Sequence, residues 1–394
     1  MKLIICILLL YIVATISIKT SSKKISPSPS SSSPIRTLLI VESPAKASTI
    51  TKILGSNYKV ESSLGHIRAI TSGNKKSTTS DTIIHGIDTA NDFKPCYEII
   101  EGKEKRVMEL KQAVKNVDRV FLASDKDREG ESISWHLADV LNLDINQCNR
   151  ITFNEITKQA LENAVNNPRT IDMSLVKSQE CRAIIDRLLG FELSQLLMKH
   201  TRTANASAGR VMSVALKLII EREADIATFL TSQYFTVNGH FNGNTKAMYN
   251  IRFQSKDDIY ALLNDLNSSS NSYTITSSEK TISEKKPLLP FVLSSALKEI
   301  CRRFSVSSES AGRCLQNLYE NGHISYHRTD SPYLSTDFRE QVKAFVDSKY
   351  GHQYYKDRVY ESKTKNSQEA HEGIRPTNVQ LTQIDSKVHY HTPY

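Results

Sequence analysis

The chain has 394 residues, of which 39% are hydrophobic and 24% are charged, and its formal net charge is +9. This composition is that of an ordinary globular protein of two to three domains, and it excludes a disordered polymer, a collagen-like fibre and a protein with many membrane spans. The basic excess is a poor guide to the partner, because residues 1–41 contain five basic residues and no acid. The cysteines form no CxxC pair, so the sequence encodes no zinc ribbon.

The first 35 residues differ in composition from the rest of the chain. Residues 3–18 carry no charge, a length that is short for a membrane span and typical of a signal-peptide core. Residues 19–36 are rich in Ser and Lys and contain no acid, so they cannot bury enough apolar surface to fold. We expect residues 1–35 to be a bipartite leader with a disordered linker, which directs the protein to a plastid and leaves no membrane segment in the mature form. Import into a mitochondrion, a secretory signal and an N-terminal anchor are the alternatives.

The residues that follow alternate between strand and helix patterns. The apolar, β-prone run 37–41 predicts a buried strand, and Ser43-Pro44 predicts the start of a helix that ends at Gly55. The other elements expected here are a helix, a strand and a helix, over residues 105–116, 120–123 and 129–140. Strands that alternate with helices are typical of a parallel sheet covered on both faces, so the fold class expected for residues 36–170 is α/β.

The second half of the chain predicts mostly helices with a strand-rich insertion. Residues 155–222 have the apolar spacing of helices, and the pattern changes to alternation around residues 233–282. Lys285-Lys286-Pro287 marks a linker. The individual elements expected here are strands over 234–237 and 273–276 and helices over 293–304 and 308–319. The short gap between the last two helices suits a winged-helix unit. With the α/β part before it, this mostly helical half makes the expected fold class of the whole chain α/β plus α.

The strongest local signal is the acidic cluster Asp125–Glu131, in which every second residue is an acid. It follows a predicted strand, and ligand crevices of open α/β sheets lie at that end of the strands. A hard cation such as Mg²⁺ suits such carboxylates. Glu42 follows the neighbouring strand and Lys46 lies one helical turn beyond it, so the two acids, a metal ion and the lysine would form a phosphoryl-transfer site. The alternative is a solvated acidic helix start, with Lys46 as a surface residue.

Several motifs, in a fixed order, carry a resemblance to a known family. Leu39–Lys46 and Asp125–Glu131 are similar to the two signature blocks of the Toprim domain. Further similar blocks are Arg150–Thr157, Arg182–Phe191, Ser207–Val211, Leu318–Ser331 and Ala370–Thr377. On these motifs the chain resembles the type IA DNA topoisomerases over residues 36–380, and within them the bacterial-type topoisomerase I branch.

The resemblance implies a fold and an activity for the whole chain. It implies an enzyme that relaxes negatively supercoiled DNA by cutting one strand and passing another, as a monomer, with Mg²⁺ and without ATP; no P-loop occurs in the sequence. The implied domains are a Toprim metal-binding domain over 36–170, the first half of a helical DNA-binding domain over 171–222, the first half of a β-rich arch over 223–285 and an incomplete active-site tyrosine domain over 286–394.

The resemblance also assigns roles to single residues. Tyr326 would attack a DNA phosphodiester and keep the 5′-phosphate as a covalent ester, and Arg328 would stabilise the phosphate charge. Glu42 and Lys46 would assist proton transfer and position the phosphate, and His371 would lie close to it. The implied metal ligands are Glu42, Asp125, Asp127 and Glu129. The residues implied to contact single-stranded DNA are His66, Arg150, Arg182, Asp186, Arg187, Ser207, Ala208, Gly209, Arg210, Val211, Met212 and Arg328. Taken alone, Tyr326 is one of 16 tyrosines and each arginine is an ordinary surface ion-pair residue.

The sequence departs from the family at a few positions. Ala183, Met198 and Met212 stand where the family usually has Arg, Trp and Gln, which implies a lost DNA contact and an altered base preference. The family chain continues well past the block that ends at Thr377, whereas this sequence stops at Tyr394. We therefore expect an incomplete gene product that does not relax supercoiled DNA.

Two other functions remain open on the sequence. One is a catalytically impaired fragment that binds single-stranded DNA. The other is a different Toprim enzyme, such as a primase or a nuclease. The segment Tyr326–Ser331 argues against the second, because those enzymes need no tyrosine there.

Overall fold

The computed structural model describes residues 37–71, 83–147, 149–241, 243–267, 272–360 and 372–384. The chain forms two compact units, one from Met1–Glu192 with Leu288–Tyr394 and the other from Leu193–Pro287. The leader expected over residues 1–35 lies outside the described residues. Among the helices of the described part, none combines the length and the apolar character needed to cross a membrane.

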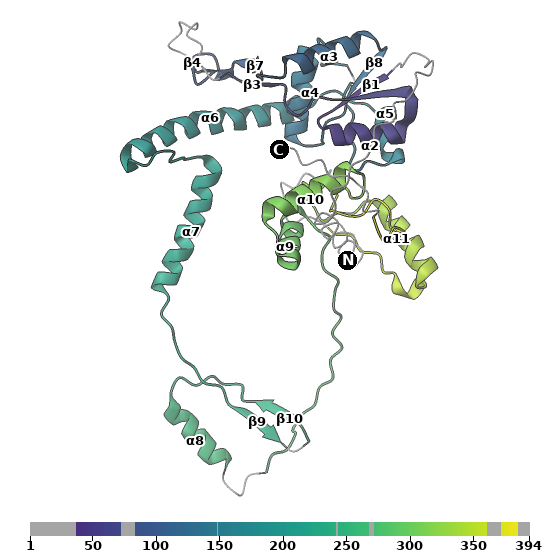
Figure 1. Ribbon diagram of the computed structural model, residues 1–394. Helices are drawn as coiled ribbons and strands as arrows, with labels where there is room; N and C mark the ends of the chain where they lie inside the picture. The colour runs from purple at the N-terminus through teal and green to yellow at the C-terminus, as the bar shows by residue number, and fades with distance from the viewer. Residues whose placement is uncertain are drawn as a thin grey trace, which may run out of the picture. The chain divides into compact units, whose positions relative to one another are not determined.

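A three-stranded parallel sheet forms the centre of the first unit (Figure 1). Its central strand is β1 (Thr37–Val41), which lies between β2 (Tyr58–Ser62) and β8 (Arg119–Leu122). Residues 38–41 are completely buried. A central parallel strand has both faces covered, so it consists of apolar residues without a polar side. The predicted α/β sheet is therefore confirmed.

Alternate side chains of β1 pack into two different cores, because the side chains of a strand point to opposite faces in turn. Leu38 and Ile40 lie in one core with α3 (Glu104–Lys115) and α4 (Arg128–Val140). Leu39 and Val41 lie in a second core with α2 (Pro44–Leu54). The helices thus cover both faces and leave the carboxyl edge of the sheet for the site.

Helix α2 begins and ends where the sequence predicts. The hydroxyl of Ser43 accepts a hydrogen bond from Lys46 N at 3.2 Å, and Pro44 occupies the first turn. Gly55 follows the helix with a φ of 71°, a left-handed conformation that favours glycine. The N-cap at Ser43 sets the direction in which the next turn, with Lys46, leaves the sheet.

Shorter elements complete the α/β part of the first unit. Arg150 forms a parallel bridge beside Leu122, at the edge of the sheet next to β8. The remaining elements are η1 (Gly55–Asn57), β3 (Arg68–Ile70), β4 (Ile83–Ile84), β5 (Ile87–Asp88), β6 (Lys94–Pro95), β7 (Tyr97–Ile99), α5 (Lys158–Asn166) and α6 (Met173–Thr201), the last of which belongs to the first unit up to Glu192.

The segment that begins at Leu288 returns to the first unit and packs against the α/β part (Figure 1). Its helices are α9 (Leu293–Phe304), α10 (Ser308–Glu320), α11 (Thr336–Lys349) and η2 (His352–Tyr354). The first two match the predicted helices, whereas α11 was not predicted. Leu315 and Leu318 of α10 lie in the same core as Leu39 of β1. One continuous core therefore joins this segment to the sheet.

The second unit corrects the predicted strands. It contains α7 (Arg210–Thr228), β9 (Asn238–Phe241), β10 (Thr245–Met248) and α8 (Lys256–Leu266). Residues 234–237 form only an isolated bridge, from Phe235 to Phe253, and residues 273–276 form no strand. The hairpin forms instead around Gly243 and Asn244, whose positive φ values reverse the chain. β-prone side chains alone mislead here because a strand also needs a partner in register.

Candidate active site

Glu42, Lys46 and Asp125 meet at the carboxyl end of the parallel sheet. Glu42 directly follows β1 and Asp125 comes shortly after β8, and parallel neighbours bring both to the same edge. The Lys46 ammonium lies between the two acids and donates to Glu42 Oε1 and, at 2.5 Å, to Asp125 Oδ1. Lys46 is completely buried. The structure thus brings together the two acids whose proximity the sequence predicts, and it excludes Lys46 as a surface residue.

The buried charges of this group shift one another's pKa values. Burial and the neighbouring charge of Asp125 raise the pKa of Glu42 to about 7. Burial alone would lower the pKa of Lys46, but the charges of Asp125 and Glu42 outweigh it and raise that pKa above its ordinary value. Burial alone would raise the pKa of Asp125, but Lys46 lowers it. At neutral pH the site therefore holds a charged Lys46–Asp125 pair beside a Glu42 carboxyl that is partly protonated.

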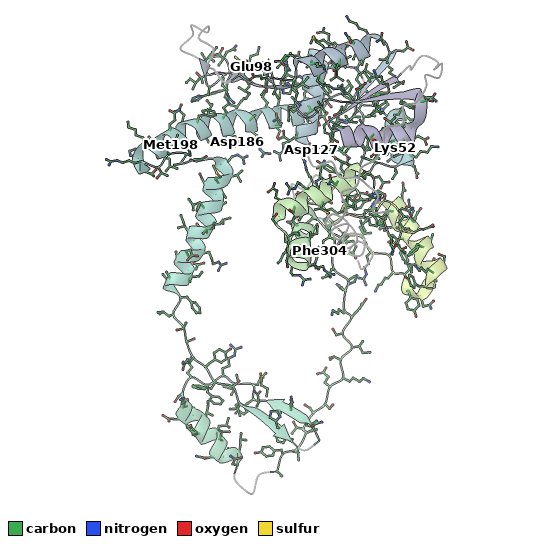
Figure 2. All side chains as sticks on the ribbon, in the orientation of Figure 1. Lys52, Glu98, Asp127, Asp186, Met198 and Phe304 are labelled. Atoms are coloured by element: carbon green, nitrogen blue, oxygen red, sulfur yellow. The ribbon has the colours of Figure 1, made fainter. Side chains whose placement is uncertain are left out.

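Tyr326 reaches the same site from the chain that follows α10. Its hydroxyl donates to Asp127 Oδ2 at 2.5 Å, and its amide donates to Asn154 O at 2.7 Å. Asp127, labelled in Figure 2, is the N-cap residue of α4. The Tyr326 side chain is only 3% exposed, and burial with the charges of Asp125 and Asp127 raises its pKa well above the ordinary value. The hydroxyl is therefore protonated and is held against a carboxylate oxygen that can accept its proton.

Arg328 lies two residues further, at the rim of the site. Its Nη1 is 3.9 Å from Asp127 Oδ2, and its Nη2 donates to Gln316 at 3.2 Å. Half of its side chain is exposed. Burial alone would lower the pKa of Arg328, but nearby Tyr326 and acidic groups raise it. A charged guanidinium at this rim can contact a phosphate that approaches Tyr326.

The acids of the 125–131 cluster face different partners. Asp127 Oδ1 accepts a hydrogen bond from Gly130 N at 2.8 Å and so caps α4. Glu129 pairs with His66 at 3.4 Å, and hydrogen bonding to His66 lowers the pKa of Glu129. The acidic cluster therefore has two roles. Asp127 caps the start of α4, as the alternative of an acidic helix start predicts, and the same residue contacts Tyr326 in the site.

The acids nearest to Tyr326 fit a divalent cation in their chemistry. Within the described residues, no group of three or more His, Cys, Asp or Glu side chains is already arranged around one metal position. The Lys46 ammonium occupies the space between Glu42 and Asp125. However, Glu42 Oε2 is buried and has no hydrogen-bond partner among the described residues, which calls for an explanation such as an ion. Together with Asp125 and Asp127 it offers the hard oxygen donors that Mg²⁺ prefers.

Comparison with known proteins assigns the family. The sequence profile described as DNA topoisomerase matches residues 170–393, more than half of the chain, and the profile described as Toprim domain matches residues 37–156. The chain belongs to the type IA DNA topoisomerase family. The structure of full-length topoisomerase I from Thermotoga maritima, in a monoclinic crystal form, is similar to it, with a TM-score of 0.72 and 35% sequence identity over 86% of this chain. This chain covers 55% of the length of that protein.

The segment that carries Tyr326 contributes two buried residues that the sequence did not single out. Tyr319 donates from its hydroxyl to Asp125 Oδ1 at 3.0 Å, and the Lys46 ammonium lies 4.8 Å from the centre of its ring. The His327 ring lies 5.6 Å from that of Tyr326, and burial lowers the pKa of His327 to about 4, so it is neutral. In the sequence Tyr319 is only one more residue on the apolar face of a helix, so no local signal marks it.

Arg150, one of the predicted DNA contacts, is buried in this structure and points its donors at protein groups. It is completely inaccessible, and its Nε donates to Glu131 Oε2 at 3.0 Å. Its Nη1 donates to Ser124 O at 2.7 Å and its Nη2 to Asp125 O at 2.6 Å. A buried guanidinium needs both a charge partner and acceptors for its donors, and it finds them here. Arg150 therefore fixes the loop that carries Asp125.

A pocket of about 400 Å³ lies beside the acidic loop in the first unit. Its wall includes His66, Arg68, Tyr97, His136, Arg187 and Phe191, together with Ala183. Arg187, a predicted DNA contact, donates to the backbone oxygens of Thr71 and His85, both at 2.8 Å. Arg187 thus ties α6 to the backbone at Thr71 and His85. Aromatic and cationic side chains around such a pocket can stack on and bind a nucleobase.

Arg182 and Asp186 lie on α6, one turn apart. Arg182 Nε is 3.5 Å from Asp186 Oδ2, and Arg182 Nη1 is 3.8 Å from Glu129 Oε1. The side chain of Arg182 is partly exposed, so it is accessible to a phosphate. Because both of its ion pairs are long and solvated, exchanging them for a phosphate contact costs little.

The remaining predicted DNA contacts, residues 207–212, belong to the second unit at the start of α7. Ser194 Oγ accepts from Ala208 N at 2.9 Å and donates to Ala208 O at 3.2 Å, which fixes this loop. Gly209 is the N-cap residue of α7, and the next three residues are exposed. Their contact with DNA stays a prediction. His371 lies outside the described residues.

Proposed function

We propose that this chain carries the strand-cleavage site of a type IA topoisomerase, which relaxes negatively supercoiled DNA without ATP. Tyr326 attacks a phosphodiester of a single strand and holds the 5′-phosphate, and a second strand passes before the break is sealed. The observation that carries the proposal is the hydrogen bond from Tyr326 to Asp127, next to the buried group of Glu42, Lys46 and Asp125. The membership in the topoisomerase family supports it.

The geometry suggests a role for each group in cleavage. The bond from Tyr326 Oη to phosphorus forms while the bond from phosphorus to the 3′-oxygen breaks. Asp127 Oδ2, 2.5 Å from Oη, is in place to take the tyrosine proton. Glu42 and the Lys46 ammonium that donates to it are in place to assist proton transfer to the leaving 3′-oxygen. Arg328 stabilises the charge of the phosphate, and religation uses the same groups in reverse.

We propose Mg²⁺ as the cation, held by Glu42, Asp125 and Asp127. Bound there, it would stabilise negative charge on the phosphate oxygens. The unpartnered buried oxygen of Glu42 supports this assignment. Glu129, the fourth ligand implied by the resemblance, pairs with His66 in the structure, so we give it a role outside the innermost set.

We propose single-stranded DNA as the partner. Arg182 and Arg328 are partly exposed, so both are available for phosphates; Arg182 pairs with Glu129 and Arg328 pairs with Asp127. The aromatic pocket beside His66 suits a base of the same strand. Binding of this kind weakens as the salt concentration rises.

Covalent trapping tests the cleavage proposal. Wild-type protein mixed with labelled single-stranded DNA and then denatured should yield a covalent protein–DNA adduct, with no ATP present. Tyr326→Phe removes the attacking oxygen and should reduce the adduct to background while DNA binding persists. Tyr333→Phe, a tyrosine change in the same segment, is the control and should retain the adduct. An adduct that persists in Tyr326→Phe would refute the nucleophile, and binding without any wild-type adduct would favour the alternative of a binding-only fragment.

For residues 1–35 we propose import into a plastid. The support is their composition, an uncharged core followed by a Ser- and Lys-rich stretch without acids. A fluorescent protein fused behind residues 1–35 should accumulate in plastids. Accumulation in mitochondria or in the secretory route would establish one of the alternatives instead.

A further inference from the structure

Tyr319 is a completely buried residue that has no role in the cleavage scheme above, yet it contacts three residues of the site. Its hydroxyl donates to Asp125 Oδ1 at 3.0 Å. Its ring lies 4.8 Å from the Lys46 ammonium. The same ring meets the Tyr326 ring edge to face, with centroids 5.2 Å apart and planes at 67°. Tyr319 thus reaches both an acid of the sheet and the proposed nucleophile.

The hydroxyl of Tyr319 fixes the carboxylate of Asp125. Asp125 Oδ1 accepts from Lys46 at 2.5 Å and from Tyr319 at 3.0 Å, so two donors from two different helices converge on one oxygen. The backbone oxygen of Asp125 is held as well, by Arg150. A carboxylate held in this way has one orientation, and groups that orient a metal ligand or a reacting group control its affinity and activity.

The ring of Tyr319 is itself rigid. It lies in the core with Leu315 and Leu318 of the same helix and with residues of the sheet. A phenol in such a core is favourable only if its hydroxyl finds a partner, because an unpaired buried hydroxyl is costly. Packing alone would be satisfied by phenylalanine. The hydroxyl therefore has its role in the contact with Asp125.

We propose that Tyr319 is a positioning residue of the cleavage site, which holds Asp125 with its hydroxyl and places its ring against Lys46 and Tyr326. This inference rests on the proposed function. It assigns to α10 the task of aligning the acids of the sheet with the tyrosine that follows the helix.

Tyr319→Phe tests the hydroxyl, because it keeps the ring. With the full chain and no DNA, calorimetry should find Mg²⁺ bound about tenfold more weakly than in wild type. The rate of adduct formation with single-stranded DNA at fixed Mg²⁺ should fall by about the same factor. The Kd for the DNA should stay within about twofold of the wild-type value, because the change lies away from the DNA contacts. Tyr355→Phe is the matched control, since it also removes a hydrogen bond from tyrosine to a carboxylate, that of Asp357 at 3.1 Å, and should change neither quantity.

Tyr319→Leu tests the ring and should slow adduct formation further than Tyr319→Phe. Wild-type Mg²⁺ affinity and adduct rate in Tyr319→Phe would overturn the inference. An equal loss of Mg²⁺ affinity, DNA affinity and thermal stability would also overturn it, because that pattern indicates a purely structural residue. If wild type binds Mg²⁺ but forms no adduct, the cleavage proposal fails while the Mg²⁺ comparison still decides the role of the hydroxyl. If wild type does neither, the proposed function and this inference fail together.

Discussion

At the scale of single residues, the buried acid Glu42 links protonation to stability. Its pKa is about 7 in the folded protein and has the ordinary value of 4.5 without the fold. Between these values the folded protein binds more protons than the unfolded one, so the free energy of unfolding falls as the pH rises. In wild type this fall in the free energy of unfolding should be on the order of 1–3 kcal/mol between the two pKa values. We predict that Glu42→Gln removes it. Urea unfolding in EDTA from pH 5 to pH 8 measures it.

The control for Glu42 is Glu162→Gln, which changes an exposed glutamate on α5. It should keep the pH dependence of wild type. If wild type and Glu42→Gln show the same pH dependence, the Glu42 carboxyl is not held protonated by its surroundings. If both variants lose it, the effect is not specific to the site.

Residues of the site differ in how far the sequence predicts them. Glu42 and Asp125 are predictable because both follow apolar runs, and neighbouring parallel strands end at one edge. Tyr326 is predictable only through the family resemblance. The burial of Arg150 is not predictable from the sequence, because it depends on a partner far along the chain, Glu131, that no local pattern reveals.

At the scale of elements, the loop between β8 and α4 depends on Gly130. A Cβ at this position would lie 2.2 Å from the backbone oxygen of Asp125, so the loop must shift to accept a side chain. We predict that Gly130→Ala destabilises the protein by about 1–3 kcal/mol and abolishes adduct formation by displacing Asp125 and Asp127. Thermal unfolding and covalent trapping measure the two effects.

Gly312→Ala in α10 is the matched control for Gly130→Ala. Its Cβ would meet nothing within 4 Å. We expect it to stabilise the protein by about 0.5–1 kcal/mol, as alanine does in place of glycine inside a helix. Normal stability and trapping in Gly130→Ala would show that the loop adapts, contrary to the prediction.

Elements whose boundaries depend on local chemistry are the predictable ones. The α2 cap at Ser43 and its end at Gly55 follow from side chains next to them in sequence. The strands of the second unit do not, because the turn at Gly243 and Asn244 determines which residues pair. Helix α11 was missed although Ser335 caps it, with Oγ accepting from Phe338 N at 3.4 Å. A cap alone is common in loops as well.

At the scale of the whole molecule, the cleavage site is assembled from segments far apart in the chain, all within the first unit. The sheet supplies Glu42 and Asp125, and the segment that returns after Leu288 supplies Tyr326. Besides the shared core, that segment is held to the α/β part by the amide of Tyr326 on Asn154 O and by an ion pair of Arg375 with Glu155 at 2.6 Å. Under the proposed function the two parts must separate for a second strand to pass, so we expect these contacts to be breakable.

The Arg375–Glu155 pair offers a direct test of that separation. Arg375 is nearly buried and is also held by Glu372 at 2.6 Å, so loss of the charge on Glu155 weakens the junction and leaves Arg375 with a charge partner. We predict that Glu155→Gln speeds hydrogen exchange of the Tyr326 amide about fivefold, for a loss of about 1 kcal/mol. Amides of β1 should exchange as in wild type, and Asp357→Asn, which breaks the Arg339 pair away from the junction, should leave Tyr326 unchanged. Equal acceleration in β1 and at Tyr326 would mean that Glu155 supports the fold as a whole and that the two parts do not open at this junction.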